Sequence, residues 1–341
     1  IYTGEDTLSL HDALPICWSI TPNNSAQLAV KLFALTVSGI LLSQLPCQYF
    51  SRRSALFLGH VVVCLVIIFN HFRNDSLQSP WYLAPSAKVF AQAGLFLSLS
   101  FWVCVYALIR SSLSLLGKTV FLVTIGLLTL MSLYHVHCDT PILGLILGAL
   151  VGLVLSFVYG NLIKRTIQAL IFLAFLLAPI ICSYTFHPDS FEKYNTIIKD
   201  PSYLHRLTIW YETAKKIRER PLLGYGLNAS RKLGSGATID LVYKDGNDNF
   251  HTVKAEKMGL HPHNVALQLW LELGVIGAGL GALITAVLFG SAYDTQEKLK
   301  RLCLFGFFTS AVFAFWVNLG AFQSWWLSSI LLLVYFFKNE S

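Results

Sequence analysis

Charged side chains are scarce in this chain of 341 residues. Asp, Glu, Lys and Arg make up only 13% of the sequence, whereas a soluble domain carries roughly 25%. Hydrophobic residues make up 55%, and the mean hydropathy is +0.60. The alternation of apolar and polar residues that membrane β-strands need is missing as well. The sequence therefore predicts an all-α bundle that spans a lipid bilayer several times.

Cysteine is sparse in the polar part of the chain. None lies in the polar stretch from His187 to His263, and most of the seven lie in or beside apolar segments. They are Cys17, Cys47, Cys64, Cys104, Cys138, Cys182 and Cys303. This distribution contains no CxxC metal pattern and no disulfide framework, so cysteine serves here as a small apolar side chain.

The first residues differ in kind from the rest. Asp6–Ile16 has the sequence DTLSLHDALPI, which resembles the translation of a common sequencing-library adapter. An ordinary polar N-terminal segment is the alternative. We treat residues 1–16 as a non-native, adapter-derived segment and leave them out of the fold prediction. We expect the natural protein to begin earlier, with further membrane spans before this chain.

Nine long apolar segments predict transmembrane helices. A helix needs about 20 predominantly apolar residues to cross roughly 30 Å of hydrocarbon. The expected spans are Ala26–Pro46, Ser54–Asn70, Ala87–Ile109, Thr119–His135, Pro141–Gly160, Thr166–Phe186, Leu269–Gly290, Leu302–Leu319 and Gln323–Phe337. The predicted domains are N-terminal membrane helices over 17–186, one large polar loop over 187–263 and C-terminal membrane helices over 264–341.

Lys and Arg gather in alternate connections between the spans. These connections hold Arg52 and Arg53, Arg110 and Lys118, Lys164 and Arg165, and Lys298, Lys300 and Arg301. The positive-inside rule assigns them to the cytoplasm, so the loop 187–263 is expected on the opposite, periplasmic face. The same bias explains the net charge of +7, which therefore does not indicate a nucleic-acid partner.

The loop 187–263 is far longer than an ordinary connection, and such loops are usually functional. It holds twelve Lys and Arg against nine Asp and Glu, a net charge of +3. Within it, Tyr203–Arg220 is predicted to form an amphipathic helix. The residues expected on its apolar face are Leu207, Trp210, Ala214 and Ile217. Pro221 is expected to end the helix, before a tight turn over 224–226 and an irregular polar segment over 232–257.

Arg206 and Trp210 form the first cluster that could carry chemistry. They lie four residues apart, hence on nearly the same face of the predicted helix. The planar, permanently charged guanidinium of Arg suits the oxygens of a phosphate. A solvated Arg beside a Trp at the membrane interface is the alternative interpretation.

The segment His261–Asn264, HPHN, forms the second cluster, directly before a long apolar segment. A histidine at a membrane boundary can titrate near neutrality and serve as a base. Asn264 can instead cap the helix that follows. A metal site built from His251, His261 and His263 is disfavoured, because no Cys or acidic ligand triad lies nearby in the sequence.

Two groups of glycines complete the motifs. The first group consists of Gly224, Gly226, Gly234 and Gly236. It lacks the GK[ST] ending of a nucleotide-binding P-loop, so a flexible turn is predicted. The second group consists of Gly274, Gly277, Gly279 and Gly281. These lie in an apolar segment and are expected to let membrane helices pack closely.

Two segments resemble the O-antigen ligase family, part of the wider superfamily of O-antigen ligases and Wzy-type polymerases. They are His205–Arg231, HRLTIWYETAKKIRERPLLGYGLNASR, and His261–Gly274, HPHNVALQLWLELG. The matching features are Arg206 with Trp210, the P-x-x-G-x-G turn from Pro221 to Gly226, and the H-x10-G spacing from His263 to Gly274. The large polar loop before the last membrane helices matches as well.

The resemblance implies transfer of an O-antigen glycan from undecaprenyl-diphosphate to a sugar hydroxyl of lipid A-core at the bacterial inner membrane. It implies no metal, nucleotide sugar or other cofactor, and a fold akin to GT-C glycosyltransferases. Arg206 would stabilise the diphosphate, and His263 would act as the base, with inversion at the anomeric carbon. The substrate-binding residues that it implies are Trp210, Arg218, Arg231, His261 and Asn264.

One position departs from the family pattern. Many relatives carry an Arg in the short outer turn 138–141, where it helps to bind phosphate, and this chain has Asp139. Arg73, Arg218 or Arg231 is expected to supply the missing cation.

Other functions stay open on sequence alone. A Wzy-type polymerase uses similar chemistry with another carrier-linked glycan as acceptor, and a protein-directed oligosaccharyltransferase belongs to the same superfamily. A transporter of lipid-linked sugars would need charged or broken helices near the bilayer midplane. The predicted spans hold few ionisable residues, which disfavours a transporter. The segment from His261 to Gly274 favours the ligase over the polymerase.

Overall fold

A computed structural model describes residues 19–21, 27–34, 37, 49–73, 85–136, 138–158, 160–187, 198, 200–234, 236–245 and 249–339. The chain forms two compact units. The loop unit is built mainly from Gln168–Val287 and Asn318–Phe322. The helix unit includes Ala34–Ile167, Leu288–Val317 and Gln323–Ser341.

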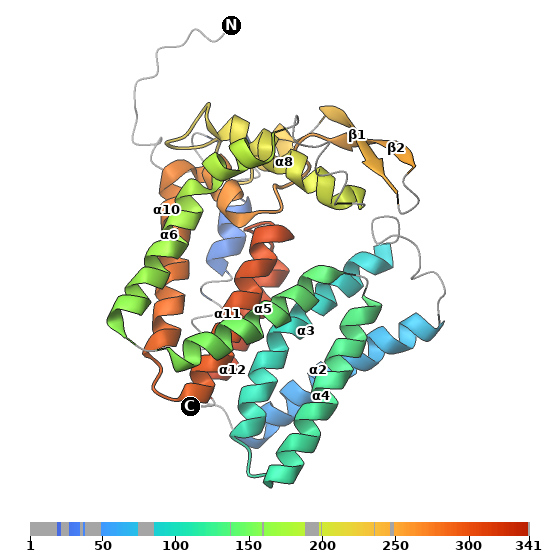
Figure 1. Ribbon diagram of the computed structural model, residues 1–341, viewed down its shortest axis with the longest axis vertical. Helices are drawn as coiled ribbons and strands as arrows, with labels where there is room; N and C mark the ends of the chain where they lie inside the picture. Colours follow the sequence, from blue (N-terminus) through green and yellow to red (C-terminus); the bar gives the residue numbers. More distant parts are fainter. Residues whose placement is uncertain are drawn as a thin grey trace, which may run out of the picture. The chain divides into compact units, whose positions relative to one another are not determined.

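Seven helices among the described residues are long and apolar enough to cross a membrane. They are α2 (Tyr49–Arg73), α3 (Pro85–Ile109), α4 (Leu115–His135), α5 (Asp139–Phe157), α6 (Asn161–Thr185), α10 (Val265–Asp294) and α11 (Lys298–Val317) (Figure 1). They confirm seven of the nine expected spans and the all-α polytopic membrane class. The ninth corresponds to α12 (Ser324–Asn339), whose apolar part is shorter. The first expected span, 26–46, lies largely outside the described residues.

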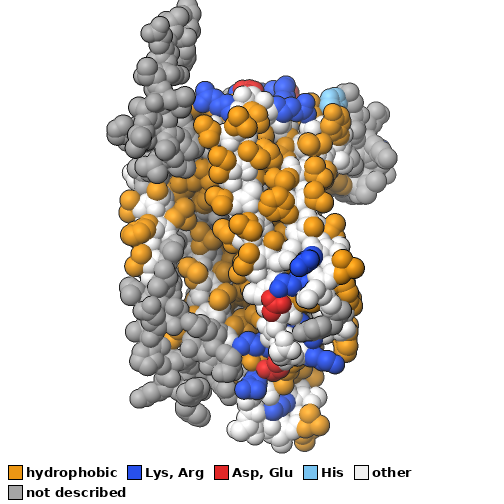
Figure 2. Space-filling view, turned by 90° about the vertical axis from the view of Figure 1, so that its left-hand side faces the viewer, with side chains coloured by type: hydrophobic (Ala, Val, Ile, Leu, Met, Phe, Trp, Pro, Cys, Tyr) orange, Lys and Arg blue, Asp and Glu red, His pale blue; other side chains and the backbone are white. Residues whose placement is uncertain are grey.

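Exposed apolar side chains cover much of the helix surface. On α6, for example, these side chains are Leu162, Leu170, Leu173, Leu177, Ile180 and Ile181. Figure 2 shows a face of the molecule on which exposed hydrophobic side chains are widespread. Water solvates such surfaces at a cost of about 25 cal/mol per Å². Hydrocarbon removes that cost, as expected of a membrane-spanning bundle.

Small residues allow α5 and α11 to pack closely within the helix unit. Gly144, Gly148 and Gly152 recur every fourth residue on α5, so they lie on one face. A Cβ atom at Gly148 would lie 2.7 Å from the carbonyl oxygen of Gly306 on α11. The hydroxyl of Ser310 donates a 2.8 Å hydrogen bond to the Gly144 carbonyl. The contact therefore depends on backbone approach as well as on apolar packing.

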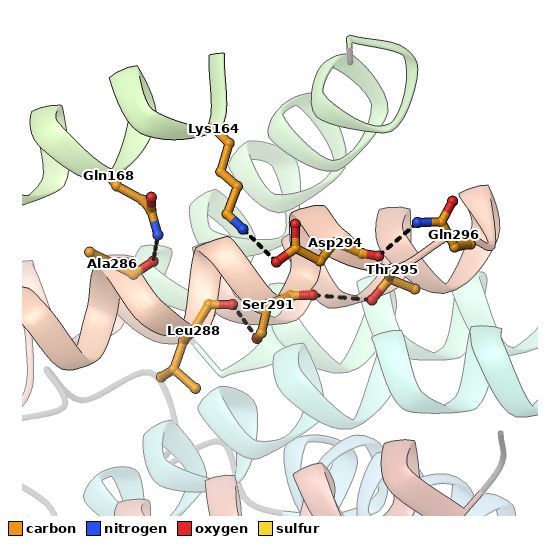
Figure 3. Close-up of polar contacts among 8 residues, drawn as sticks. All are labelled: Lys164, Gln168, Ala286, Leu288, Ser291, Asp294, Thr295 and Gln296. Carbon is orange, nitrogen blue, oxygen red and sulfur yellow. Dashed lines mark hydrogen bonds and ion pairs between the residues drawn. The ribbon is translucent and has the colours of Figure 1, made fainter. Parts of the chain in front are cut away.

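Basic residues from two connections lie at one end of the helix unit. Lys164, at the start of α6, forms an ion pair with Asp294 at the end of α10 (Figure 3). The Lys298 ammonium lies 5.8 Å from the ring centroid of Phe157 at the end of α5. Lys300 lies 5.6 Å from the ring centroid of Tyr106, near the end of α3. These contacts place the α5–α6 and α10–α11 connections and the end of α3 at the same end of the helix unit. This agrees with the alternation of basic connections along the sequence.

The loop unit contains α8 (Pro201–Ile217), the short α9 (Ser230–Leu233) and a hairpin of β1 (Thr238–Lys244) and β2 (Phe250–Glu256). In Figure 1, α8 lies beside the hairpin. The carboxylate of Asp200 caps α8 by accepting a 2.8 Å hydrogen bond from the Ser202 amide. These elements confirm the predicted helix.

The buried face of α8 differs in part from the predicted one. Ala214 and Ile217 are buried as expected, but Leu207 and Trp210 are half-buried. The other buried residues are Leu204, Thr208, Ile209 and Thr213. The buried face of α8 differs from the predicted face because the prediction counted only apolar residues. Two threonines, Thr208 and Thr213, belong to the buried face.

The expectation of an irregular polar segment over 232–257 was wrong, because this segment contains the hairpin. Its strands pair antiparallel, with Thr238 opposite Glu256 and Lys244 opposite Phe250. Ile239, Leu241 and Tyr243 are less exposed than Thr238, Asp240 and Val242, which is the period-two alternation of a strand. Interspersed charges and the short length of the strands concealed that signal.

Candidate active site

Trp210 connects α8 to the histidine loop, His261–Asn264, which precedes α10. Its indole Nε1–H donates a 2.9 Å hydrogen bond to the Pro262 carbonyl. The Trp210 ring also contacts Phe186, with 5.5 Å between ring centroids. The hydrogen bond from Trp210 thus attaches the histidine loop to α8. The substrate-binding role of Trp210 stays a prediction.

His263 is held by its backbone and by one ring nitrogen. Its Nδ1 lies 2.8 Å from the carbonyl oxygen of Asn318. A carbonyl oxygen can only accept, so a neutral His263 carries its proton on Nδ1 and keeps a lone pair on Nε2. The His263 amide donates a 3.2 Å hydrogen bond to Nδ1 of His261, and the two rings lie 4.2 Å apart. This arrangement leaves Nε2 as the nitrogen that can accept a proton.

The surroundings keep His263 neutral at physiological pH. Burial is the main cause, followed by the nearby His261, and Arg206 and His205 add to the effect. The hydrogen bond to Asn318 opposes it, and together these contributions lower the pKa of His263 from 6.5 to about 3. The imidazole is therefore available as a proton acceptor throughout the physiological range.

The backbone of His263 lies in the left-handed region, with φ at +53°. A non-glycine residue in a sparsely populated conformation costs on the order of 1–3 kcal/mol, and such residues cluster at functional sites. The neighbouring Asn264 is buried, and its Oδ1 accepts a 3.0 Å hydrogen bond from the Leu267 amide. Asn264 thus caps α10, as the alternative interpretation expected, and helps to hold the strained residue beside it.

Arg206 lies one turn before Trp210 on α8 and is half-buried. It is close enough to His263 to contribute to the lowering of that residue's pKa. Its guanidinium carbon also lies 5.5 Å from the ring centroid of Tyr203. The structure therefore brings Arg206 and His263, predicted from segments 57 residues apart in the chain, into one electrostatic environment.

The other residues that the sequence suggested for the site lie elsewhere on the loop. Arg218 directly follows α8 and Arg231 lies on α9; both side chains are exposed. His251 lies on β2, where its Nε2 is 2.9 Å from an Asp245 carboxylate oxygen. Within the described parts of the chain, no three His, Cys, Asp or Glu residues are grouped as metal ligands.

Asp139 is the residue that stands where many relatives carry an Arg. It begins α5 in the helix unit, and its side chain is exposed. A carboxylate is favourable at a helix N-terminus because it complements the helix dipole. In the same unit, the ring of His135 stacks on His71, with 3.8 Å between centroids. The side chain of Arg73 and all of His137 lie outside the described structure.

The P-x-x-G-x-G turn fits a break in α10. Gly274 has φ at +63° and interrupts the helix, which frees the carbonyls of the preceding turn. The amides of Tyr225 and Gly226 donate to the carbonyls of Leu271 and Glu272, at 2.9 and 2.8 Å. In the opposite direction, the Val275 amide donates to the Pro221 carbonyl at 2.9 Å. We call these paired segments, Pro221–Gly226 and Leu271–Val275, the glycine junction.

Glycine is required where the two segments of the junction touch. A Cβ atom at Gly224 would lie 2.6 Å from the carbonyl carbon of Glu272, and one at Gly274 would collide with the Leu222 carbonyl. Gly274 therefore approaches the polar loop and not another membrane helix, which corrects the prediction. Gly279 meets nothing within 4 Å, so its predicted packing role was wrong, whereas Gly281 does contact Phe175 of α6.

Sequence reasoning missed three contributors to this site, namely Glu272, Gln268 and the Asn318 carbonyl. Glu272 and Gln268 are almost fully buried and hydrogen-bonded to each other at 3.0 Å. An acidic residue inside an apolar segment was a usable signal, because ionisable residues in membrane helices are rarely without a role. The Asn318 carbonyl has no sequence signature, since every residue carries one.

Comparisons with known proteins identify the family of this chain. The O-antigen ligase family matches residues 95–282, which is more than half of the chain. A Rickettsia felis protein named "Putative polysaccharide ligase" is 26% identical over 322 residues, covering 92% of this chain and 74% of that protein. A similarly named Rickettsia conorii protein is 27% identical over 310 residues, covering 90% and 71%. No solved structure matches this chain at a significant level. The chain belongs to the O-antigen ligase family.

Proposed function

We propose that this protein is a glycosyltransferase of the bacterial inner membrane that moves O-antigen glycan from undecaprenyl-diphosphate to a sugar hydroxyl of lipid A-core. The observation that carries the proposal is His263, which keeps a free Nε2 lone pair and shares an environment with Arg206. A neutral base beside a fixed cation suits a reaction in which a hydroxyl attacks and a diphosphate leaves.

In the proposed reaction, the acceptor hydroxyl oxygen bonds to the anomeric carbon while the bond from that carbon to the diphosphate oxygen breaks. The hydroxyl proton passes to Nε2 of His263, and undecaprenyl-diphosphate leaves with the electron pair, which inverts the anomeric centre. The hydroxyl becomes acidic as its new bond forms, so a weakly basic imidazole can accept the proton. Negative charge grows on the leaving diphosphate, and Arg206 stabilises it more strongly in the transition state.

The other predicted residues take supporting roles in this proposal. Trp210 and His261 border His263, and Asn264 holds the start of α10. Arg218 and Arg231 are exposed cations on the same loop, where they could meet phosphate groups of a substrate. The proposal needs no metal ion and no nucleotide sugar.

We further propose that the loop 187–263 faces the periplasm, in a fold akin to GT-C enzymes. Its support is the basic end of the helix unit, which the positive-inside rule assigns to the cytoplasm. From Lys164, α6 runs on to Thr185, a distance of about 32 Å at 1.5 Å per residue. A cysteine introduced at the exposed Lys254 should react with a membrane-impermeant maleimide in intact spheroplasts. Labelling only after lysis would contradict this orientation.

The function is tested by complementing a strain that lacks its ligase with the full gene and examining lipopolysaccharide on a gel. Wild type should restore the ladder, whereas His263→Ala and Arg206→Ala should each abolish it at unchanged membrane abundance. His251→Ala and Lys215→Ala are the controls, because they remove an exposed histidine and an exposed cation from the same loop. Both controls should keep the ladder.

Two results would redirect the proposal. A wild type that lengthens carrier-linked glycan but attaches none to lipid A would be a Wzy-type polymerase. Movement of the carrier-linked glycan across the membrane without any transfer would indicate a transporter. A ladder that persists in His263→Ala would contradict the assignment of the base.

A further inference from the structure

Glu272 has no part in the proposed bond-making steps, yet it lies at the centre of a hydrogen-bond network. Its side chain is 0% exposed, on α10 just before the break at Gly274. One carboxyl oxygen accepts from the Asn228 amide, and the other accepts from the Ser230 hydroxyl. The second oxygen also accepts from the side-chain amide of Gln268, at 3.0 Å. Hydrogen bonds from Asn228, Ser230 and Gln268 therefore converge on the two carboxyl oxygens.

Asn228 adopts a backbone conformation that suits this contact. Its φ is +64°, in the left-handed region that Asn tolerates better than most residues. The turn from Gly226 to Ser230 consequently wraps around residue 272, since the Gly226 amide also bonds the backbone carbonyl of Glu272 at 2.8 Å. Glu272 thus fixes one segment of the polar loop to α10 through both backbone and side chain.

Gln268 extends the network toward the candidate base. Its Oε1 accepts a 2.7 Å hydrogen bond from the Ala321 amide. Ala321 belongs to the same short segment as Asn318, whose carbonyl holds Nδ1 of His263. A Cβ atom at Gly320 would lie 3.2 Å from both Gln268 Oε1 and the His261 ring, so this segment is closely packed against both. A continuous chain of contacts therefore runs from Glu272 to His263.

We propose that Glu272 is a positioning residue that, through Gln268 and the segment 318–322, holds the Asn318 carbonyl against Nδ1 of His263. It thereby fixes the tautomer and orientation in which Nε2 faces the attacking hydroxyl. The inference rests on the proposed function, since it concerns the base of that reaction. Glu272 itself touches no reacting atom.

The hydrogen-bond directions make Glu272→Gln a sharp test. The new NH2 group must face either the Asn228 amide or the Gln268 amide, and each of these is a donor. Rotating Gln268 relieves the second conflict but turns its NH2 group toward the Ala321 amide, another donor. Every arrangement leaves one pair of opposed donors, so the network from Asn228 through residues 272 and 268 to Ala321 is broken at one contact, in a side chain of unchanged shape.

The double variant Gln268→Glu with Glu272→Gln restores each contact from Asn228 through positions 272 and 268 to Ala321. The carboxylate introduced at position 268 accepts from the Ala321 amide and from the side-chain amide introduced at position 272. The oxygen of that side-chain amide accepts from the Asn228 amide, while the Ser230 hydroxyl rotates to accept from its nitrogen. The exchange therefore reverses the polarity of the network and keeps its geometry.

The experiment measures kcat and KM for glycan transfer by the full-length protein in proteoliposomes, with purified carrier-linked donor and lipid A-core. We expect Glu272→Gln to insert normally and to lower kcat by about 100-fold, the scale of a small misplacement of a catalytic group. KM should change little, and the double variant should recover most of kcat. A kcat near wild type in Glu272→Gln, loss of that variant from the membrane, or failure of the double variant to recover kcat would each overturn the proposal.

The same assay separates this inference from the proposed function. His263→Ala is measured in parallel, and its loss of transfer supports the base. If His263→Ala stays active, the proposed function fails, whatever Glu272→Gln does. If His263→Ala is inactive and Glu272→Gln is normal, only the positioning role fails.

Discussion

The helix unit and the loop unit are held together by different interactions. In the helix unit, apolar helices meet through small residues, as along α5 and α11. In the loop unit, hydrogen bonds join segments far apart in the chain, such as Pro221–Gly226 with Leu271–Val275. Packing of the first kind needs small side chains where the helices touch, whereas the second depends on particular backbone angles and donors. The candidate site lies entirely in the loop unit.

We expect the largest loss of activity from a substitution in the glycine junction of the loop unit. Gly274→Ala introduces a Cβ atom that collides with the Leu222 carbonyl, at a backbone angle that alanine rarely adopts. We expect loss of transfer activity and a large rise in proteolysis of the loop. The control is Gly279→Ala on the same helix, where nothing lies within 4 Å. Normal activity and protease resistance in Gly274→Ala would show that the junction is not essential.

A smaller loss is expected from Gly148→Ala in the helix unit. The added Cβ atom would lie 2.7 Å from the Gly306 carbonyl, so α5 and α11 must separate. Overpacking of this kind costs typically about 1–3 kcal/mol. Thermal unfolding in detergent should show a lower midpoint, while Gly126→Ala on α4, which meets nothing within 4 Å, should not. Equal midpoints for both variants would contradict the close contact.

Trp210→Phe should have a moderate effect on the site. It keeps an aromatic ring on α8 but removes the hydrogen bond to the Pro262 carbonyl. A neutral hydrogen bond contributes about 1 kcal/mol. We expect roughly a fivefold fall in transfer rate if that energy serves to place His263, because 1.4 kcal/mol corresponds to a factor of ten. An unchanged rate would mean that Trp210 acts only through its ring.

Lys164→Ala tests a surface contact, and its expected effect is small. The ion pair with Asp294 is partly exposed, and exposed pairs contribute roughly 0–1 kcal/mol. Thermal unfolding should shift slightly, and transfer activity should stay unchanged. A large loss of activity would instead connect this end of the helix unit to the reaction.

The pH dependence of transfer should be the weakest effect. The pKa of His263 is lowered from 6.5 to about 3, so the folded protein disfavours the proton. The neutral His263 side chain therefore makes a pH-dependent contribution to the free energy of unfolding. This contribution is complete above pH 6.5 and is lost as the pH falls through about 3. We therefore expect no acid limb from His263 in the rate between pH 5 and pH 8 at about constant ionic strength. An acid limb near pH 6.5 that disappears in His263→Ala would contradict this environment.

The sequence was sufficient to find the membrane-spanning helices of both units. A bilayer selects uncharged segments of sufficient length, so hydropathy found α2 to α6, α10 and α11 without any knowledge of their contacts. The α8 helix and the cap at Asn264 were also predictable, since both are local features. The hairpin was missed because its period-two pattern is short and rich in charges.

The arrangement of the site was only partly predictable. Arg206 and His263 were found through motifs, and their closeness is observed, but their chemical roles stay predictions. The pairing of Gly224 with Glu272 and of Gly274 with Leu222 is a long-range contact that no local pattern encodes. The Asn318 carbonyl, which sets the tautomer of His263, was unpredictable because a backbone group has no residue type.

The central claim is that Nε2 of His263 accepts the proton of the attacking hydroxyl. A single-turnover measurement tests it most directly, with full-length protein in proteoliposomes, undecaprenyl-diphosphate-linked glycan and lipid A-core. We predict that His263→Ala slows transfer by about 10²–10⁴-fold, the usual contribution of a general base, while His251→Ala stays at the wild-type rate. A His263→Ala rate within about threefold of wild type would contradict the claim, since general-base catalysis contributes far more than that.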